Sequence, residues 1–199
     1  MRALSFAALA AAAIAAPLLT PDHPWAVPDG SLQYLSTAHG GAWSVSNPAF
    51  NGGAPLAATI PGDLVTDLQA AGAIGDPFYE LGFLNTTTPG ALGAPVWDVG
   101  IWSYSMQFSL SPALAAAVAA GSTPCLVFDG VKMAATVYLN GIALGDVVDQ
   151  FLRYNFELSA SALSPQNNLN NLTIAFGTSR DPRNAEGRFS GASGGWDCA

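Results

Sequence analysis

The sequence holds 199 residues, of which half are hydrophobic and only a tenth are charged. Such a chain has the length and the apolar content for one folded domain with a sizeable core, which argues against intrinsic disorder. Asp and Glu outnumber Lys and Arg by 14 to 6, which gives a formal net charge of −8, and the cations are scattered along the chain. Because no basic stripe exists, the charge pattern gives no support to nucleic acid or an anionic membrane as a partner.

Residues 1–16 have the pattern of a secretory signal peptide, with a basic residue, an alanine-rich apolar run and small residues before Pro17. The apolar run, of roughly 14 residues, falls short of the ~20 that a transmembrane helix needs. An uncleaved anchor and an organelle-targeting peptide stay open as alternatives. We expect residues 17–29 to form a linker and residues 30–199 the domain, in a protein that is secreted or held in a lysosomal or vacuolar lumen.

Two N-glycosylation sequons agree with the secretory pathway. They begin at Asn85, in Asn85-Thr86-Thr87, and at Asn171, in Asn171-Leu172-Thr173. Both asparagines are candidate glycosylation sites, and because sequons occur often by chance they add modest weight to secretion.

The chain after the linker reads as a series of short strands separated by Gly, Pro and Asn turn signals. One short helix is predicted over residues 63–71, with Asp63 as its N-cap and Gly72 closing it, and residues 112–120 read as a helical turn or insertion. Residues 81–99 are irregular, which is typical of a functional or a disordered loop. The predicted strands are 32–36, 43–46, 56–60, 102–110, 125–128, 134–139, 151–158 and 170–177.

The three predicted strands within residues 125–158 suggest a β-meander. Asn140-Gly141 predicts a tight hairpin, since a type I′ turn needs positive φ at both central residues. Alternation over 151–158 predicts one buried face, formed by Leu152, Tyr154, Phe156 and Leu158. The fold class that follows from all these elements is an all-β sandwich with jelly-roll connectivity and one short helix.

Residue types that carry chemistry are sparse. Neither a GxSxG motif nor a phosphate-binding loop is present, and the three glutamates stand in unrelated segments. His23 and His39 lie in Pro/Gly-rich context without a Cys/His cluster, so no metal site and no cofactor are predicted. Cys125 opens a buried strand and reads as an inert core thiol, although a disulfide with Cys198 stays open.

The tail, residues 180–197, combines aromatic rings with charged groups. Aromatic faces contact the C–H surface of a sugar, and carboxylate or Arg groups bind its hydroxyls, so this composition suggests a carbohydrate site. A docking segment or disorder is the alternative. The residues concerned are Arg180, Arg183, Arg188, Phe189, Trp196 and Asp197.

Seven segments in order are similar to one family. They are IPGDLVTDL (60–68) with AGAI (71–74), DPFY (76–79), WSY (102–104), LVFDGV (126–131), VYLNG (137–141), FLRYNF (151–156) and SGGWD (193–197). With them the chain resembles the N-terminal, non-catalytic jelly-roll domain of family 2 glycoside hydrolases, particularly the β-mannosidase branch. The resemblance covers most of residues 30–197.

The resemblance implies a galactose-binding-like sandwich that packs against an immunoglobulin-like domain and a TIM barrel, and the barrel supplies both catalytic glutamates. No catalytic residue is therefore expected in this chain, which we expect to be inactive alone. The family motif Gly-Trp-Asp-Trp lines the terminal mannose subsite; Trp196 and Asp197 match its first Trp and its Asp, and Cys198 replaces the second Trp.

A chain that ends within this motif looks truncated before the barrel. The expected function is that of the sugar-binding domain of a secreted β-mannosidase-like glycosidase, with a β-mannoside or a related glycan such as a glucosaminide as ligand. A free-standing carbohydrate-binding or interaction module is the alternative, and a purely structural sandwich is a third interpretation.

Overall fold

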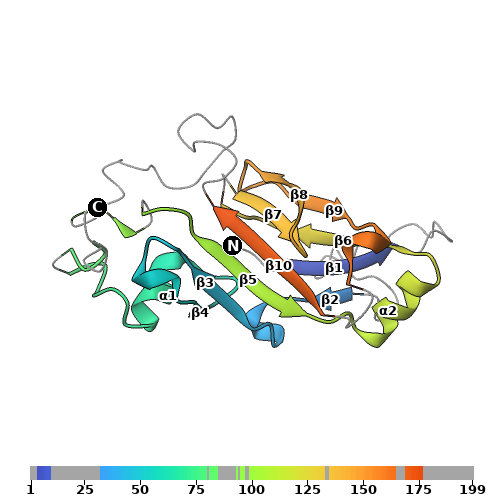
Figure 1. Cartoon of the computed structure of the whole chain (residues 1–199), viewed down its shortest axis with the longest axis horizontal. Helices are drawn as coiled ribbons and strands as arrows, with labels where there is room; N and C mark the ends of the chain where they lie inside the picture. The colour runs from blue at the N-terminus through green and yellow to red at the C-terminus, as the bar shows by residue number, and fades with distance from the viewer. Residues whose placement is uncertain are drawn as a thin grey trace.

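The computed structural model describes residues 32–79, 81–84, 93, 95–96, 99–132, 135–164 and 169–176, together with the backbone of 4–9. Within these ranges the chain forms two antiparallel β-sheets and two α-helices, which lie at opposite ends of an elongated molecule (Figure 1). The predicted all-β sandwich is confirmed. Its strands are β1 (Leu4–Leu9), β2 (Leu32–Tyr34), β3 (Trp43–Ser46), β4 (Leu56–Ala58), β5 (Ser103–Phe108), β6 (Thr123–Phe128), β7 (Ala135–Leu139), β8 (Ile142–Val147), β9 (Tyr154–Glu157) and β10 (Asn170–Phe176), and its helices are α1 (Leu64–Ala70) and α2 (Pro112–Ala119).

The two sheets pair strands that are distant in the sequence. One sheet has the order β2-β1-β6-β9 and the other the order β4-β3-β5-β10-β7-β8. Consecutive strands β6 and β7 therefore belong to different sheets, and the chain crosses from one layer to the other between them. Crossings of this kind are typical of a jelly-roll sandwich. The edge strands are β2 and β9 in one sheet and β4 and β8 in the other.

Strand β5 supplies the centre of the core. Trp102, Tyr104, Met106, Phe108 and Leu110 are all buried, as their alternation predicts. They pack with inward-facing side chains of β3, β7 and β10, and β5 pairs directly with β3 and β10. Antiparallel sheets with one buried and one solvated face show this period of two.

Helix α1 forms as the sequence predicts. The Asp63 side chain accepts a hydrogen bond from the Thr66 backbone N–H at 2.9 Å, so the helix has the N-cap expected of it. Gly72 follows the helix with φ +66°, a left-handed conformation that glycine adopts at little steric cost. Leu68 is fully buried and anchors the helix to the sandwich.

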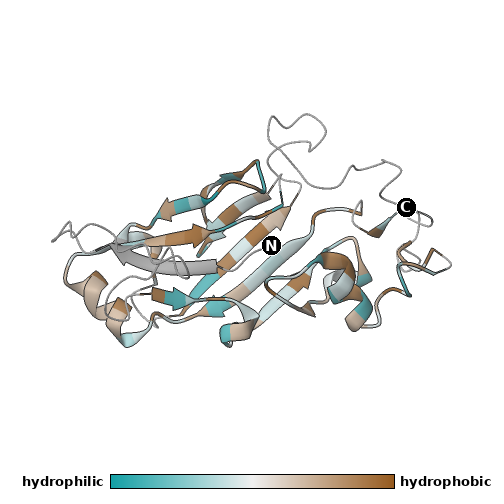
Figure 2. Ribbon diagram, turned by 180° about the vertical axis from the view of Figure 1, so that it is seen from behind, coloured by the Kyte–Doolittle hydropathy of each residue, from teal (hydrophilic) through white to brown (hydrophobic). Residues whose placement is uncertain are grey.

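The sequence predicts a single helix, residues 63–71, and only a helical turn or insertion at residues 112–120. The structure has a second helix there, α2. Its physical basis is local: Ser111 caps it, Pro112 occupies the first turn, and alanine favours helix throughout. Figure 2 shows it as largely hydrophobic along its length, although only Leu114 is buried.

The Asn140-Gly141 turn is confirmed, with φ of +51° and +80° at its two residues. It joins β7 to β8, a partner strand that the sequence pattern missed. Asn140 also fixes its surroundings through its side chain, which donates to the Ala162 carbonyl at 2.8 Å and accepts from the Asn171 N–H at 2.8 Å.

The β-meander prediction is wrong, since β6 pairs with β9 and β1, whereas β7 pairs with β8 and β10. The strand predicted over 151–158 is also shorter and begins at Tyr154. Asp149 accepts hydrogen bonds from Phe151 and Leu152, so a local turn replaces the first part of the strand. Leu152 is consequently 52% exposed instead of buried, whereas Leu158 is buried as predicted.

Two leucines at the start of β10 allow a matched test of this core. Leu172 is fully buried and Leu169 is 46% exposed. Leu172→Ala is expected to lower the free energy of unfolding by about 2–5 kcal/mol, because it leaves a cavity in the core. Leu169→Ala should change it by less than about 0.5 kcal/mol, as measured by urea denaturation. Equal losses in the two variants would contradict the packing described.

Candidate functional site

Most of the predicted site residues lie outside the described residues. This applies to Trp196, Asp197 and Asn85, and also to Cys198. Asn171 is described and is exposed on β10, as the prediction of an N-glycosylation site requires, but its modification stays a prediction. A candidate site in the described part of the chain must therefore be built from other residues.

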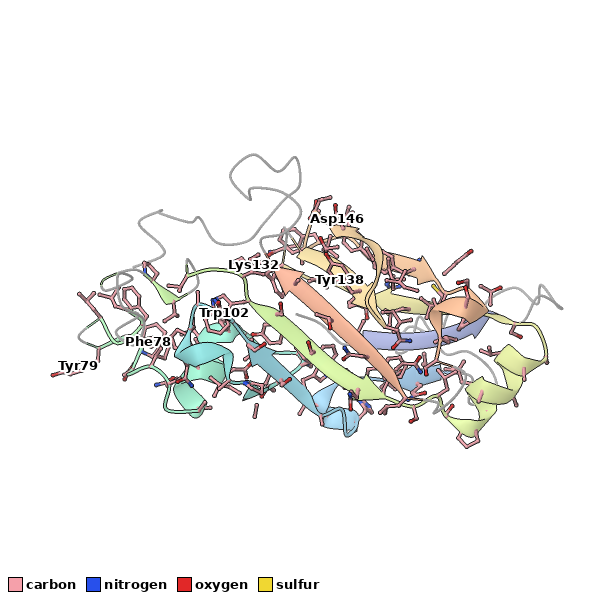
Figure 3. The ribbon with its side chains drawn as sticks, in the orientation of Figure 1. Phe78, Tyr79, Trp102, Lys132, Tyr138 and Asp146 are labelled. Atoms are coloured by element: carbon pink, nitrogen blue, oxygen red, sulfur yellow. The ribbon has the colours of Figure 1, made fainter. Side chains whose placement is uncertain are left out.

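Among the described residues, the most exposed aromatic side chains lie on one loop, residues 75–84, which we call the aromatic loop; residue 80 of this loop is not described. Phe78 is 91% exposed, Tyr79 is 66% exposed and Leu81 is 62% exposed. Figure 3 shows Phe78 and Tyr79 at the end of the molecule beyond α1, with Tyr79 extending away from the sandwich. Large apolar side chains gathered in this way make the loop a candidate contact surface for another molecule or another domain.

Backbone hydrogen bonds close the aromatic loop. The Gly75 N–H donates to the Gly82 carbonyl at 3.0 Å, and the Gly82 N–H donates to the Tyr79 carbonyl at 3.0 Å. Asp76 adds a side-chain bond, since its carboxylate accepts from the Phe78 N–H at 2.9 Å. These hydrogen bonds define the backbone at the described residues of the loop.

The two ends of the loop approach so closely that they require glycine. A Cβ atom on Gly82 would lie 2.2 Å from the Asp76 carbonyl oxygen, which no side chain tolerates. Leu81 next to it adopts φ +59°, a conformation that costs on the order of 1–3 kcal/mol in a residue other than glycine. Strain of this kind is concentrated at functional sites, where the surrounding structure holds it in place.

The base of the loop connects to the core. Val96 donates its N–H to the Phe83 carbonyl at 3.1 Å, and its own carbonyl accepts from the Trp102 ring N–H at 2.8 Å. Both Val96 and Trp102 are buried. These contacts connect the base of the aromatic loop to buried residues of the sandwich.

A buried carboxyl group holds α1, the helix that precedes the loop. Asp67 is 3% exposed, and it accepts a hydrogen bond from the Thr59 N–H at 2.9 Å and lies 3.5 Å from the Tyr104 hydroxyl. Burial raises the pKa of Asp67 above its ordinary 3.8, against the opposing effect of the Thr59 hydrogen bonds. Burial likewise raises the pKa of the Tyr104 hydroxyl, with the nearby Asp67 adding to the effect.

A second candidate is a cavity of about 530 Å³ where edge strands β8 and β9 meet β6. Its volume falls in the range of small-molecule sites. Burial, followed by the nearby Glu157, raises the pKa of the Cys125 thiol, so the inert thiol that the sequence predicts agrees with its surroundings. The lining residues are Thr123, Cys125, Leu144, Asn155, Phe156 and Glu157.

A third group of polar side chains lies on the outer face at β7 and β8, where Figure 3 shows Lys132, Tyr138 and Asp146. Thr136 donates its hydroxyl to Asp146 at 2.7 Å, so this carboxylate already has a partner. Charged and hydroxyl groups on the solvated face of an antiparallel sheet are ordinary surface, and they define no site here.

Metal ligands do not cluster in the described residues, which contain no group of three or more His, Cys, Asp and Glu side chains placed to hold an ion. Across the same described residues, no helix has the length and apolar character to cross a membrane.

The arrangement of the sandwich is that of a known class. A crystal structure of β-D-mannosidase from Dictyoglomus thermophilum matches 68% of this chain and 15% of that chain, with a TM-score of 0.53 and 22% sequence identity. At this level of identity the match establishes the fold, which is the galactose-binding-like jelly roll found at the N-terminus of such enzymes.

The sequence comparison then gives the family. Residues 43–192 match the glycosyl hydrolase 2 galactose-binding domain-like family, and the chain belongs to it. β-Mannosidase from Mus musculus is 31% identical over 120 residues, and β-mannosidase from Bos taurus is 28% identical over 130 residues. These matches cover 60% and 65% of this chain, but the chain spans only 12% and 13% of the length of those relatives.

The sequence analysis identified the segment DPFY (76–79) as a point of resemblance, but it did not predict that Phe78 and Tyr79 are exposed. The signal that was available is the combination of an Asp-Pro turn with two adjacent aromatic residues between Gly75 and Gly82. An aromatic pair within a turn has no strand or helix face through which to reach the core. Exposure is then its expected state.

The pKa of Asp67 makes a prediction about stability. Its pKa is higher in the folded protein than in the unfolded chain, so the folded state binds the proton more tightly, and the resulting stabilisation is lost as the pH rises above about 4. The free energy of unfolding of the wild type, minus that of Asp67→Asn, should therefore decrease between about pH 3 and pH 7. Urea titrations of both proteins at each pH measure this difference; a difference that rises or stays constant would contradict the buried carboxyl described.

Proposed function

We propose that this chain is the non-catalytic sugar-binding domain of a secreted β-mannosidase-like glycoside hydrolase, and that it contributes to the terminal mannose subsite. The observation that carries the proposal is the similarity of 120–130 residues to mammalian β-mannosidases, within the domain family to which the chain belongs. A carbohydrate is then the ligand of the domain, and a catalytic barrel with an immunoglobulin-like domain forms its context.

The catalytic carboxylates of the proposed enzyme lie in the barrel. Glycoside hydrolysis needs two carboxyl groups on either side of the scissile bond, and a TIM barrel requires roughly 200–250 residues of its own. The sandwich contributes binding: the Trp196 ring would pack against the C–H face of the terminal sugar, and Asp197 would accept hydrogen bonds from its hydroxyls.

The role of Asp197 can be measured in the complete gene product. Asp197→Ala should lower kcat/KM for a β-mannoside by about 10- to 100-fold, since a hydrogen bond to a charged group contributes roughly 1.5–3 kcal/mol. Asp146→Ala, at an exposed aspartate of β8 that belongs to none of the candidate sites, is the matched control and should leave turnover unchanged. Unchanged turnover in Asp197→Ala would remove the subsite role, and a complete product without mannosidase activity would favour the free-standing carbohydrate-binding module.

Secretion is the second part of the proposal. The predicted signal, residues 1–16, includes β1, whose backbone pairs with β2 on one side and β6 on the other. Signal cleavage would therefore remove a strand from the middle of the four-stranded sheet.

We expect the product of a eukaryotic secretory host to begin near Pro17 and to carry glycan at Asn85 and Asn171. N-terminal sequencing gives the first result, and the mass lost on deglycosylation, absent for a site replaced by Gln, gives the second. If protein recovered from the culture medium still begins at Met1, residues 1–16 stay with the domain. Retention of the product inside the cell would contradict secretion.

A further inference from the structure

Strand β1 occupies a position that the proposed processing would empty. Its residues, Leu4–Leu9, pair antiparallel with β2 on one side and with β6 on the other, inside the four-stranded sheet (Figure 1). The same residues belong to the predicted signal, residues 1–16, whose removal is part of the proposed function. The processed domain would therefore have a gap one strand wide between β2 and β6, which we call the strand slot.

One side of the strand slot is β2, which has contacts of its own to the rest of the sandwich. Gln33 of β2 donates its side-chain amide to the Ser109 carbonyl at 2.8 Å and accepts from the Ser111 N–H at 2.9 Å. Directly after β2, the Leu35 carbonyl accepts from the Trp43 ring N–H at 2.6 Å, and both of these residues are buried. These contacts would keep β2 in place after its pairing with β1 is lost.

The other side of the slot is β6, which is buried on both of its faces. Leu126 and Phe128 lie in the core, and Cys125 and Val127, which alternate with them, are each only 8% exposed. Without a partner in the slot, one edge of this strand would carry unpaired N–H and C=O groups, which costs free energy and favours pairing with another extended chain. The slot therefore needs an occupant.

The backbone of β6 shows which amides face the slot. The Pro124 carbonyl accepts a hydrogen bond from the Leu158 N–H at 2.8 Å, on the side of β9. Successive residues of a strand direct their N–H and C=O groups to opposite edges, so Leu126 and Phe128 also face β9. Cys125 and Val127 face the slot. Amides of one strand thus report separately on its two edges.

We propose that the strand slot accepts an extended segment of the same protein from outside these 199 residues, which adds antiparallel to β2 and β6 after residues 1–16 are removed. The inference rests on the proposed signal cleavage. Strand β1 shows that the slot fits a strand of 6 residues, or roughly 20 Å of extended chain. In strand addition of this kind, main-chain hydrogen bonds supply the affinity.

The occupant is more readily supplied within the protein than by a second copy. The chain spans 12% and 13% of the length of two mammalian relatives, which leaves most of a protein of that length outside it. A segment linked to the domain binds intramolecularly and is therefore present at high effective concentration. Processing removes β1 from every copy, so a second copy has no such strand to exchange.

The experiment compares hydrogen exchange of β6 in three proteins. The first is the 199-residue chain made in a bacterial cytosol with Met1 retained, the second is the product of the same chain from a eukaryotic secretory host, and the third is the complete gene product from that host. Mass spectrometry with fragmentation resolves single amides, and N-terminal sequencing shows where each protein begins.

Cys125 and Val127 should be protected in the first and third proteins and should exchange on the order of 100-fold faster in the second. Leu126 and Phe128 are the matched control, because β9 pairs with them in all three proteins. If the loss of β1 unfolds the second protein, the control amides lose protection as well, and the comparison of the first and third proteins decides.

Three results would overturn the proposal. One is fast exchange of Cys125 and Val127 in a complete product that begins near Pro17, since the slot is then empty. Another is protection of these amides in the second protein, because the occupant then comes from residues 17–199 or from a second copy, which sedimentation distinguishes. The third is a complete product that keeps Met1 and with it β1. The Asp197→Ala kinetics test the proposed sugar binding separately, and none of these results changes that test.

Discussion

The buried face of β5 is the feature on which the rest of the structure depends. Tyr104 lies on it and Trp102 immediately precedes the strand, and each has a polar atom that needs a partner inside the core. Trp102 finds its partner in the Val96 carbonyl, and Tyr104 lies beside Asp67 of α1. The alternation that fills the core therefore also positions the base of the aromatic loop and the helix that leads into it.

This coupling connects a loop with exposed rings to the core of the sandwich. Its backbone bonds are internal, its closest approach is made possible by Gly82, and its base rests on buried side chains of the sandwich. Phe78 and Tyr79 are exposed on this loop.

Much of this architecture could be predicted from the sequence because its signals are local. Asp63 as an N-cap, Asn140-Gly141 as a hairpin turn and the alternation around Tyr104 each act within a few residues, and each is confirmed. Sheet order is different, because it depends on which strands meet across the core. The meander prediction failed for that reason, and the 151–158 strand was predicted too long because the turn at Asp149 competes with strand pairing.

Sites were harder to predict than elements. The resemblance to family 2 glycoside hydrolases led to Trp196 and Asp197, which stay predictions, whereas the exposure of Phe78 and Tyr79 follows only from the folded loop. Composition could not reveal that exposure, since the same two residue types fill the core elsewhere, as Phe108 and Tyr104 do. An aromatic ring is buried where it lies on the inner face of a strand and exposed where it lies in the closed turn.

The most direct test of sugar binding is to measure intermolecular nuclear Overhauser effects between the protein and a bound mannotriose, with the ring protons of the aromatic residues assigned. A domain that contributes Trp196 to the terminal sugar subsite, as proposed, should show contacts from the Trp196 ring to the C–H protons of the sugar. Contacts that arise only from other residues, or none at saturating mannotriose, would contradict it.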